Sequence, residues 1–587
     1  MRLAHKTAVS ALVLGALSCT ASRIAPPATR PCETASPTRR EEAPAAKSPA
    51  LASKLPPIRI VLRPEPGDKP HVHVDLYAEG ATLATLRLAT AALEDIEHVI
   101  AEDARGALST SLSSSPPGIT VTLHRPPSGP LHVTYDVRAT ANPNSNTFDL
   151  IVAEDRFRGM GERLVLLPSG LENEKANVTV DIETKPIVAP RFASSLGLGP
   201  RTREGYGRSL VHAAFLAGSL GGAVFDEGID HDETVWLGYT SFDPRPAAAE
   251  VATVRTALRE MWHGGGEQEF ALLLVSSPRP VGAYALAPRA SSLLVHMGPS
   301  EPWSAALRIA VTQHLMRSWI GGELRIAPGD GGNEAESSWF TEGALRYFAG
   351  RALRRLGLIS VEDARDFVNG LSSAQATSPH RGKSNAAVAA LAASHPLARP
   401  HLMARGALYA IRVAATLRAR KKRSLEDVVS KLLEQARQTH APVPVTAWTD
   451  AIVDELGPGE KAQFDRFLAG DDIALSSEAL GSCFRGSTGE YTAFEMGFDL
   501  QETLDAATRT IARLDAAGPA AVSGLLPTDV LADASFRYGH AETQVVLSID
   551  RNGRKSEIKY LPRGARGKGI VYTRKAGIPD LACGDVL

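Results

Sequence analysis

The sequence predicts a multidomain α+β protein with an antiparallel β domain first, a mostly helical domain second and a small mixed domain last. Its 587 residues exceed the size of one ordinary domain. Along residues 58–188, apolar and polar residues alternate between turns rich in Pro and Gly, which is typical of strands with one buried face. Longer segments with helical periodicity follow. We therefore expect domains at 58–188, 189–440 and 441–587.

The N-terminus has the pattern of an export signal. Arg2 and Lys6 precede an apolar stretch at residues 7–17, which is too short to span a bilayer as a stable helix. Residues 16–19, Ala-Leu-Ser-Cys, resemble a bacterial lipobox, in which Cys19 is lipidated and becomes the mature N-terminus. An ordinary signal cut near Ser18 remains open, as does a cytosolic location. We expect a lipoprotein of the cell envelope, at the outer membrane or in the periplasm, or a secreted protein.

Residues 20–57 are rich in Pro, Ala, Ser and Thr, so we expect a disordered tether between the signal segment at 1–19 and the first domain. The formal net charge is −1, which gives no bulk electrostatic case for a nucleic-acid partner. Membrane contact is expected only through the N-terminal lipid anchor. The expected partners are peptides or envelope proteins.

Two motifs carry the strongest resemblance to a known family. Residues 311–319 read V-T-Q-H-L-M-R-S-W and residues 338–343 read S-W-F-T-E-G, and both are expected on helices. Together they resemble the zinc metallopeptidases related to glycyl aminopeptidase, of the gluzincin type. That family has an N-terminal β domain, a thermolysin-like helical peptidase domain and a C-terminal PDZ domain. Its H-E-x-x-H helix supplies two zinc ligands and a general base, and W-F-x-E-G supplies the third ligand.

The resemblance also implies that the catalytic centre is degenerate. Aligned on Trp319, the two His ligands of the family fall on Gln313 and Arg317, and the general base falls on His314. The third ligand remains as Glu342. Zinc needs about three protein ligands with free lone pairs, and a permanently charged guanidinium offers none. We expect no metal and an ion pair between Arg317 and Glu342; the alternative is a metal held by His314 and Glu342.

Two further catalytic positions of the family are replaced. Residues 284–292 resemble an edge strand whose Glu holds the amino end of the substrate, and that position is Ala287. Residues 402–408 resemble a segment whose Tyr stabilises the oxyanion, and that position is Met403, which cannot donate a hydrogen bond. In contrast, Asp230-His231-Asp232 has no partner cluster nearby in the sequence, and we expect a solvated loop there.

The C-terminal part resembles a PDZ domain at residues 494–498 and 518–531. The carboxylate-binding loop of such a domain would contain Met496, Gly497 and Phe498, with a peptide added as a strand. A purely structural role for this module remains open, because the usual Gly-Asp pair is Thr528-Asp529 here. Asn552-Gly553 predicts a hairpin turn between the last strands.

Cys483 and Cys583 lie on either side of this module. In an exported protein two such cysteines are expected to form a disulfide, with free thiols as the alternative.

Three functions follow from these observations. The first is a catalytically inactive peptidase homologue that binds peptides or partner proteins and needs no cofactor. The second is an active metal-dependent hydrolase with zinc at a non-standard site. The third is a structural envelope lipoprotein without a ligand.

Overall fold

The computed structural model describes residues 55–90, 93–115, 118–139, 150–189, 191–227, 229–238, 240–277, 279–289, 291–328, 334–395, 397–506, 508–584 and 586–587. The expected signal segment, the lipidation site Cys19 and the tether up to residue 54 lie outside these residues. Among the described residues, no helix has both the length and the apolar character that a membrane-spanning helix needs.

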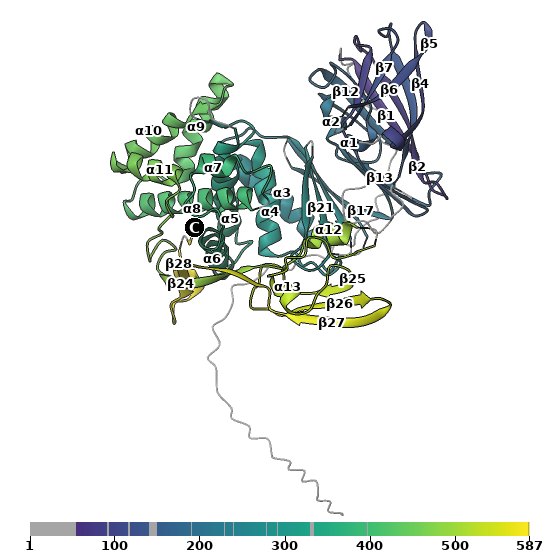
Figure 1. The fold of residues 1–587 in the computed structure, drawn as a ribbon. Coiled ribbons are helices and arrows are strands. Elements are labelled where there is room, and N and C mark those ends of the chain that lie inside the picture. The colour runs from purple at the N-terminus through teal and green to yellow at the C-terminus, as the bar shows by residue number, and fades with distance from the viewer. Residues whose placement is uncertain are drawn as a thin grey trace, which may run out of the picture. The chain divides into compact units, whose positions relative to one another are not determined.

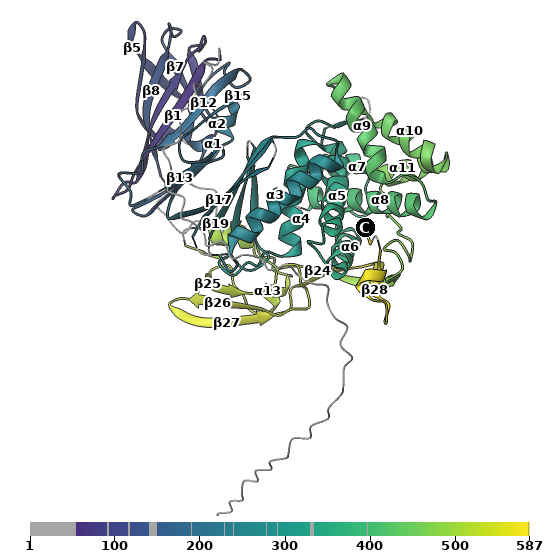
Figure 2. The same cartoon turned by 180° about the vertical axis from the view of Figure 1, so that it is seen from behind.

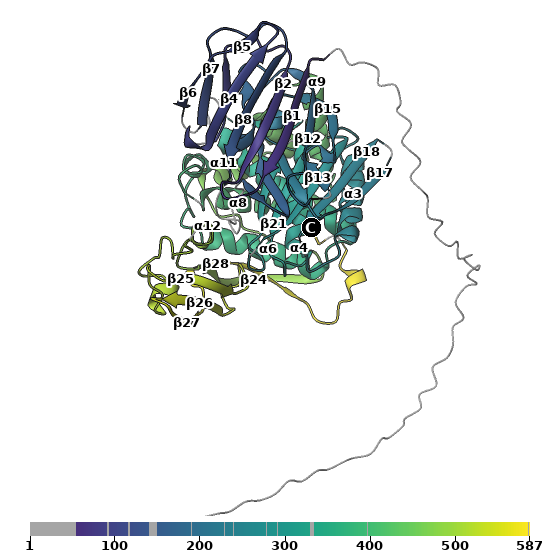
Figure 3. The same cartoon turned by 90° about the vertical axis from the view of Figure 1, so that its right-hand side faces the viewer.

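The first part of the chain consists of three β-sheets around one core (Figures 1 and 3). The seven-stranded sheet has the order β15 (Arg201–Tyr206), β12 (Lys175–Ile182), β1 (Pro57–Glu65), β2 (His71–Ala78), β8 (Leu131–Arg138), β4 (Ile96–Asp103), β5 (Gly106–Leu108). The four-stranded sheet has the order β11 (Leu167–Pro168), β3 (Thr85–Leu88), β7 (Gly118–Leu123), β6 (Thr110–Ser115). The five-stranded sheet has the order β14 (Gly197–Leu198), β13 (Arg191–Ser194), β16 (Ala214–Gly218), β10 (Arg156–Met160), β9 (Ile151–Ala153). Three short helical turns connect these strands: η1 (Leu93–Asp95), α1 (Gly161–Leu164) and α2 (Arg208–Val211).

This β part differs from the expected antiparallel arrangement in one pair, because β1 runs parallel to β12. Residues beyond 188 also contribute to its core. Leu210, Phe215 and Ala217 bury their side chains in the same core as the first strands, which keeps β16 in this unit.

A second sheet follows, with the order β17 (Leu220–Glu227), β18 (Asp230–Leu237), β19 (Glu269–Ser276), β21 (Ser292–Met297), β20 (Ala285–Arg289). Strands β18, β19 and β21 are parallel, and β17 and β20 are antiparallel edge strands. Both faces of β19 are covered. Leu272 and Leu274 pack into the helical core, whereas Leu273 and Val275 pack against β16. This burial explains the continuous apolar run in the sequence of β19.

Helix α3 (Pro244–Met261) connects β18 to β19 and lies along the sheet (Figures 1 and 2). The remaining helices form the large core beside it: α4 (Ala305–Leu315), α5 (Leu345–Arg355), α6 (Val361–Ala376), α7 (Asn385–Ala389), α8 (Ala398–Ala419), α9 (Leu425–Thr439), α10 (Val445–Leu456) and α11 (Gly459–Ala469). Short elements between them are η2 (Met316–Ser318), β22 (Ile326–Ala327), η3 (Glu334–Ser337), the π-helical turn η4 (Trp339–Ala344) and β23 (Val443–Pro444).

The helical core includes residues beyond 440. Trp339 lies at its centre, with its ring centroid 5.5 Å from that of Trp448, 5.2 Å from that of Phe464 and 5.6 Å from that of Phe467. These partners come from α10 and α11, so both helices belong to the same core as the W-F-T-E-G motif.

The C-terminal part has a core of its own, built by residues between Met496 and Tyr560. Its strands β25 (Val530–Ser535), β26 (Val545–Arg551) and β27 (Arg554–Tyr560) form one sheet, with α12 (Leu500–Asp505) and α13 (Pro519–Val522) beside it (Figure 1). A separate pair of long strands, β24 (Phe484–Phe494) and β28 (Arg563–Arg574), packs on α6, and η5 (Asp580–Ala582) follows. A disulfide joins Cys483 to Cys583, the pair that the sequence singled out.

Candidate functional site

The motif helix α4 ends within the motif. Ser304 caps its N-terminus by accepting a hydrogen bond from the Leu307 backbone N–H at 3.3 Å. The helix places Gln313 and His314 in its last turn, and Arg317 follows in the tighter turn η2. Trp319 fixes this turn, because its ring is buried and its Nε1 donates to the Gly264 carbonyl at 2.8 Å.

Glu342 lies on the π-helical turn η4, which packs closely on α8. A Cβ atom built on Gly343 would lie 2.6 Å from the Gly406 Cα and 2.9 Å from the Met403 carbonyl oxygen. Only glycine permits this approach. The contact brings the first turns of α8 beside the Glu342 side chain.

The carboxylate of Glu342 is held by an arginine that the sequence analysis did not identify. Arg399 Nε donates to the two carboxylate oxygens at 2.9 and 2.8 Å, and a second guanidinium nitrogen also donates to Oε1. The predicted pair with Arg317 is present as a longer contact, with 3.8 Å between the guanidinium nitrogen and Oε1. Gln313 Nε2 donates to the Glu342 backbone carbonyl at 3.3 Å. Gln313, Arg317 and Glu342 thus lie together as predicted, but the main partner of the Glu342 carboxylate is Arg399.

Two arginines therefore share one buried carboxylate. Hydrogen bonding to Glu342 raises the pKa of Arg399. Burial lowers the pKa of Arg317; the Glu342 charge opposes this shift, and the Arg399 charge adds to it. The charge of Arg317 is consequently the less well compensated of the two.

His314 is directed away from Glu342. Its Nε2 donates to the Ser292 carbonyl on β21 at 3.0 Å, and because a carbonyl only accepts, Nδ1 carries the lone pair. That Nδ1 is buried and has no hydrogen-bond partner. Burial, followed by the charge of Arg317, lowers the pKa of His314 to about 4. The ring is thus neutral at pH 7.

The residues present do not fit a zinc ion. Glu342 is engaged by Arg399, His314 faces β21, and Gln313 and Arg317 are not metal ligands of the required kind. Within the described part of the chain, no group of three His, Cys, Asp or Glu side chains is arranged to hold a metal.

The two other replaced positions lie on the elements that the resemblance implies. Ala287 is buried on the edge strand β20, opposite Leu294 of β21. Met403 is on α8, one turn after Arg399, and is partly buried. Neither side chain offers a charge or a hydrogen-bond donor.

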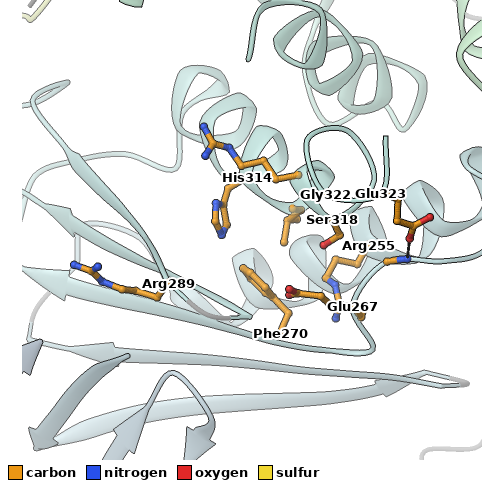
Figure 4. A pocket seen from close by; sticks show the side chains of 11 residues that line it. Arg255, Glu267, Phe270, Arg289, His314, Ser318, Gly322 and Glu323 are labelled. Carbon is orange, nitrogen blue, oxygen red and sulfur yellow. Dashed lines mark hydrogen bonds between the residues drawn. The ribbon is translucent and has the colours of Figure 1, made fainter. Parts of the chain in front are cut away.

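A cavity of about 420 Å³ lies beside the motif (Figure 4). In the close-up, the side chains of His314, Phe270 and Glu267 border the same space, with Arg289 on one side and Arg255 on another. Burial raises the pKa of Glu267. The residues that line the cavity are Arg255, Gly266, Glu267, Phe270, Arg289, His314, Leu315, Arg317, Ser318, Gly322 and Glu323.

The structure contradicts the expectation of a solvated loop at Asp230-His231-Asp232. These residues form the start of β18 rather than a solvated loop, and both aspartates are buried. Asp232 pairs with Arg255, and Asp230 pairs with Arg259. The acidic pair thus holds the arginine that lines the cavity, a role that the sequence pattern did not reveal.

The loop with Met496, Gly497 and Phe498 belongs to the C-terminal core. The side chains of Met496 and Phe498 are buried there, and the Tyr560 hydroxyl donates to the Met496 carbonyl at 2.8 Å. Gly497 has a φ of 80°, which favours glycine. Helix α12 starts at Leu500, so the segment directly after the loop is helical rather than extended.

Taken together, the site consists of a mixed sheet, a helical bundle and two motif segments that meet at Glu342. A scan against protein-family models found no match, and neither did a search of the curated proteins. Among solved structures, the chain is similar to an aminopeptidase N family protein from Idiomarina loihiensis, with 15% identity and a TM-score of 0.63 over 90% of this chain and 100% of that chain.

The search of solved structures also found two more distant matches. One is an M1 zinc metallopeptidase from Deinococcus radiodurans, with 14% identity and a TM-score of 0.44 over 72% of this chain and 94% of that chain. The other is yeast LTA4 hydrolase, with 11% identity and a TM-score of 0.43 over 72% of this chain and 69% of that chain. The likeness to the Idiomarina protein shows that the chain has an aminopeptidase N type of fold.

Proposed function

We propose that this chain is a catalytically inactive peptidase homologue that binds peptides or extended segments of partner proteins. The observation that carries the proposal is the set of contacts made by the Glu342 carboxylate. Its carboxylate is bound by Arg399 through both oxygens, and Arg317 lies 3.8 Å away. Two guanidinium charges occupy the surroundings where a peptidase of this fold needs a divalent cation, and the like charges oppose its binding.

The cavity and the strand at its border support a binding role. Among the described residues, strand β20 pairs only with β21, so its other edge offers backbone groups to an added strand. Arg289, at the end of β20, lines the cavity. An extended peptide along β20 would lead one of its residues into the cavity.

The sequence supports two further parts of the proposal: an exported location and a role for the C-terminal module. The signal-like N-terminus favours export, with lipidation at Cys19 or simple cleavage. The separate core around Met496, Gly497 and Phe498, with the PDZ resemblance, favours a module that either contacts a second peptide segment or stabilises the chain. The helical start of α12 favours the structural role, because a peptide added as a strand needs an extended edge directly after the loop.

Metal content and peptidase activity test this proposal directly. We expect the purified wild-type protein to contain no stoichiometric zinc and to leave short peptides uncleaved. The informative variants restore the family residues: Gln313→His, His314→Glu and Arg317→His, with and without Arg399→Ala. Because Arg399 binds the Glu342 carboxylate, we expect zinc binding only when all four substitutions are combined. Zinc near one equivalent in the wild type, removable together with peptidase activity, would overturn the proposal.

A further inference from the structure

The cavity contains an arginine without a hydrogen-bond partner. Arg255 and Arg289 pair with Asp232 and Glu162. Arg317 donates no hydrogen bond to any described residue, and its nearest carboxylate, at 3.8 Å, is that of Glu342, which Arg399 already holds. The Arg317 side chain is 39% exposed, so its guanidinium donors are open to a ligand.

An unpaired acceptor lies close to this cation. His314 lies three residues before Arg317 and lines the same cavity, and its Nδ1 is a buried lone pair without a donor. Glu267 is a second acceptor on the cavity wall, and burial favours its neutral form by raising its pKa. A cation on the same cavity wall as the unpaired acceptor His314 Nδ1 matches a ligand that carries an oxyanion next to an N–H group.

The size and the apolar walls of the cavity limit the ligand further. A volume of about 420 Å³ is at the small end of the range for small-molecule pockets. Phe270 and Leu315 supply apolar surface on its walls. The cavity can therefore enclose one residue, while the remainder of a peptide lies outside.

We propose that this cavity binds the C-terminal residue of a peptide. The carboxylate pairs with Arg317, the amide N–H of that residue donates to His314 Nδ1, and its side chain packs on Phe270 and Leu315. This inference rests on the proposed peptide-binding function and adds the direction of the ligand. The resemblance implies that an amino end would be anchored by a carboxylate on the edge strand, and the residue there is Ala287.

The test compares ligands on the unmodified protein, so it does not depend on how a variant folds. Isothermal titration calorimetry would use N-acetyl-alanyl-leucine, its C-terminal amide, and inorganic phosphate. We expect the free acid to bind at least tenfold more tightly than the amide. Equal affinity of acid and amide would overturn the inference. Phosphate binding as tight as that of the acid would also overturn it, since it would show a general oxyanion site.

Variants then test which arginine binds the carboxylate of the peptide. Arg317→Gln should reduce binding of the acid to the level of the amide and leave binding of the amide unchanged. Arg355→Gln is the matched control, because Arg355 is a half-exposed arginine of α5 outside the cavity lining. Its affinities should equal those of the wild type. An Arg317→Gln protein that keeps the preference for the acid would exclude Arg317 as the anchor.

The same titrations separate the two proposals. Peptide binding without a preference for the free carboxylate overturns only the C-terminal assignment. Cleavage of the peptide during titration, detected by mass spectrometry, overturns the proposed non-catalytic function. Absence of binding by every peptide overturns both.

Discussion

Arg399 binds both carboxylate oxygens of Glu342, with Nε 2.9 Å from Oε1 and 2.8 Å from Oε2. A fork of this kind gives both geometric specificity and charge compensation. The Glu342 side chain is only 8% exposed, while that of Arg399 is 58% exposed. The pair thus gives a buried carboxylate a charged hydrogen-bond partner from α8.

Removal of Arg399 should destabilise the protein. Arg399→Gln leaves the buried Glu342 with Arg317 alone, at 3.8 Å. Because Arg399 is largely solvent-exposed, we expect a loss of about 1–2 kcal/mol in the free energy of unfolding, below the 3–5 kcal/mol of a fully buried pair. Urea denaturation would measure it. In a double-mutant cycle, Glu342→Gln should remove most of the effect; an additive double variant would show that the pair is not coupled.

The close packing of η4 on α8 gives a second prediction. Gly343→Ala places a methyl group 2.6 Å from the Gly406 Cα, where both neighbours are backbone and cannot rotate away. We expect a loss of about 1–3 kcal/mol in unfolding free energy, as for overpacked sites. A shift of α8 would also move Arg399, so the Arg399–Glu342 contact should weaken.

The control for this substitution is another helical glycine. Gly370 lies inside α6, and a Cβ on it would meet nothing within 4 Å. Gly370→Ala should therefore stabilise the protein by about 0.5–1 kcal/mol, because the helix gains propensity without a clash. Thermal unfolding of the two variants should move in opposite directions, and a stabilising Gly343→Ala would contradict the packing argument.

Much of this site could be predicted from the sequence, because the motifs are local. Trp319 and the W-F-T-E-G block placed Gln313, Arg317 and Glu342 near one another, and the structure brings them together. Asn552-Gly553 likewise marked a hairpin, and both residues have positive φ in the turn between β26 and β27. In such cases the residues that specify the geometry are adjacent in the sequence.

The features that the sequence did not reveal depend on long-range contacts. Arg399 is 57 residues from Glu342, and nothing local distinguishes it from other surface arginines. One signal was present: it lies four residues before Met403 and so shares its helix face. Asp232 was also misjudged, since only the partner Arg255 from α3 makes a buried carboxylate acceptable. Phe215 and Trp448 likewise lie in cores formed by distant segments, which a local pattern does not reveal.

The disulfide between Cys483 and Cys583 should contribute to stability. It links residues 100 positions apart, and closure of so long a loop restricts the unfolded chain considerably. We expect reduction to lower the free energy of unfolding by about 2–5 kcal/mol, measured in denaturant with and without dithiothreitol. The Cys483→Ser, Cys583→Ser double variant should equal the reduced wild type and should not respond to the reductant. A response of that variant would attribute the effect to another cause.

The buried His314 predicts a pH dependence of stability. Its pKa is lowered to about 4 in the folded state, first by burial and then by the charge of Arg317, whereas an unfolded histidine titrates near 6.5. Between these values the unfolded chain binds a proton that the folded chain does not, so stability falls as pH decreases from about 6.5 to about 4. The difference corresponds to roughly 3 kcal/mol at most. Above pH 7 this contribution is fully present.

A comparison with a non-titrating variant isolates this contribution. His314→Gln keeps a polar side chain and cannot gain a charge in this range. Its free energy of unfolding, measured in urea at pH 7.5, 6, 5 and 4.5, should fall less steeply than that of the wild type. Part of the slope should remain in the variant, because burial also lowers the pKa of His401 to about 4. Identical slopes for the two proteins would show that His314 is accessible to protons in the folded state, and the unpartnered Nδ1 would then not be sealed from solvent.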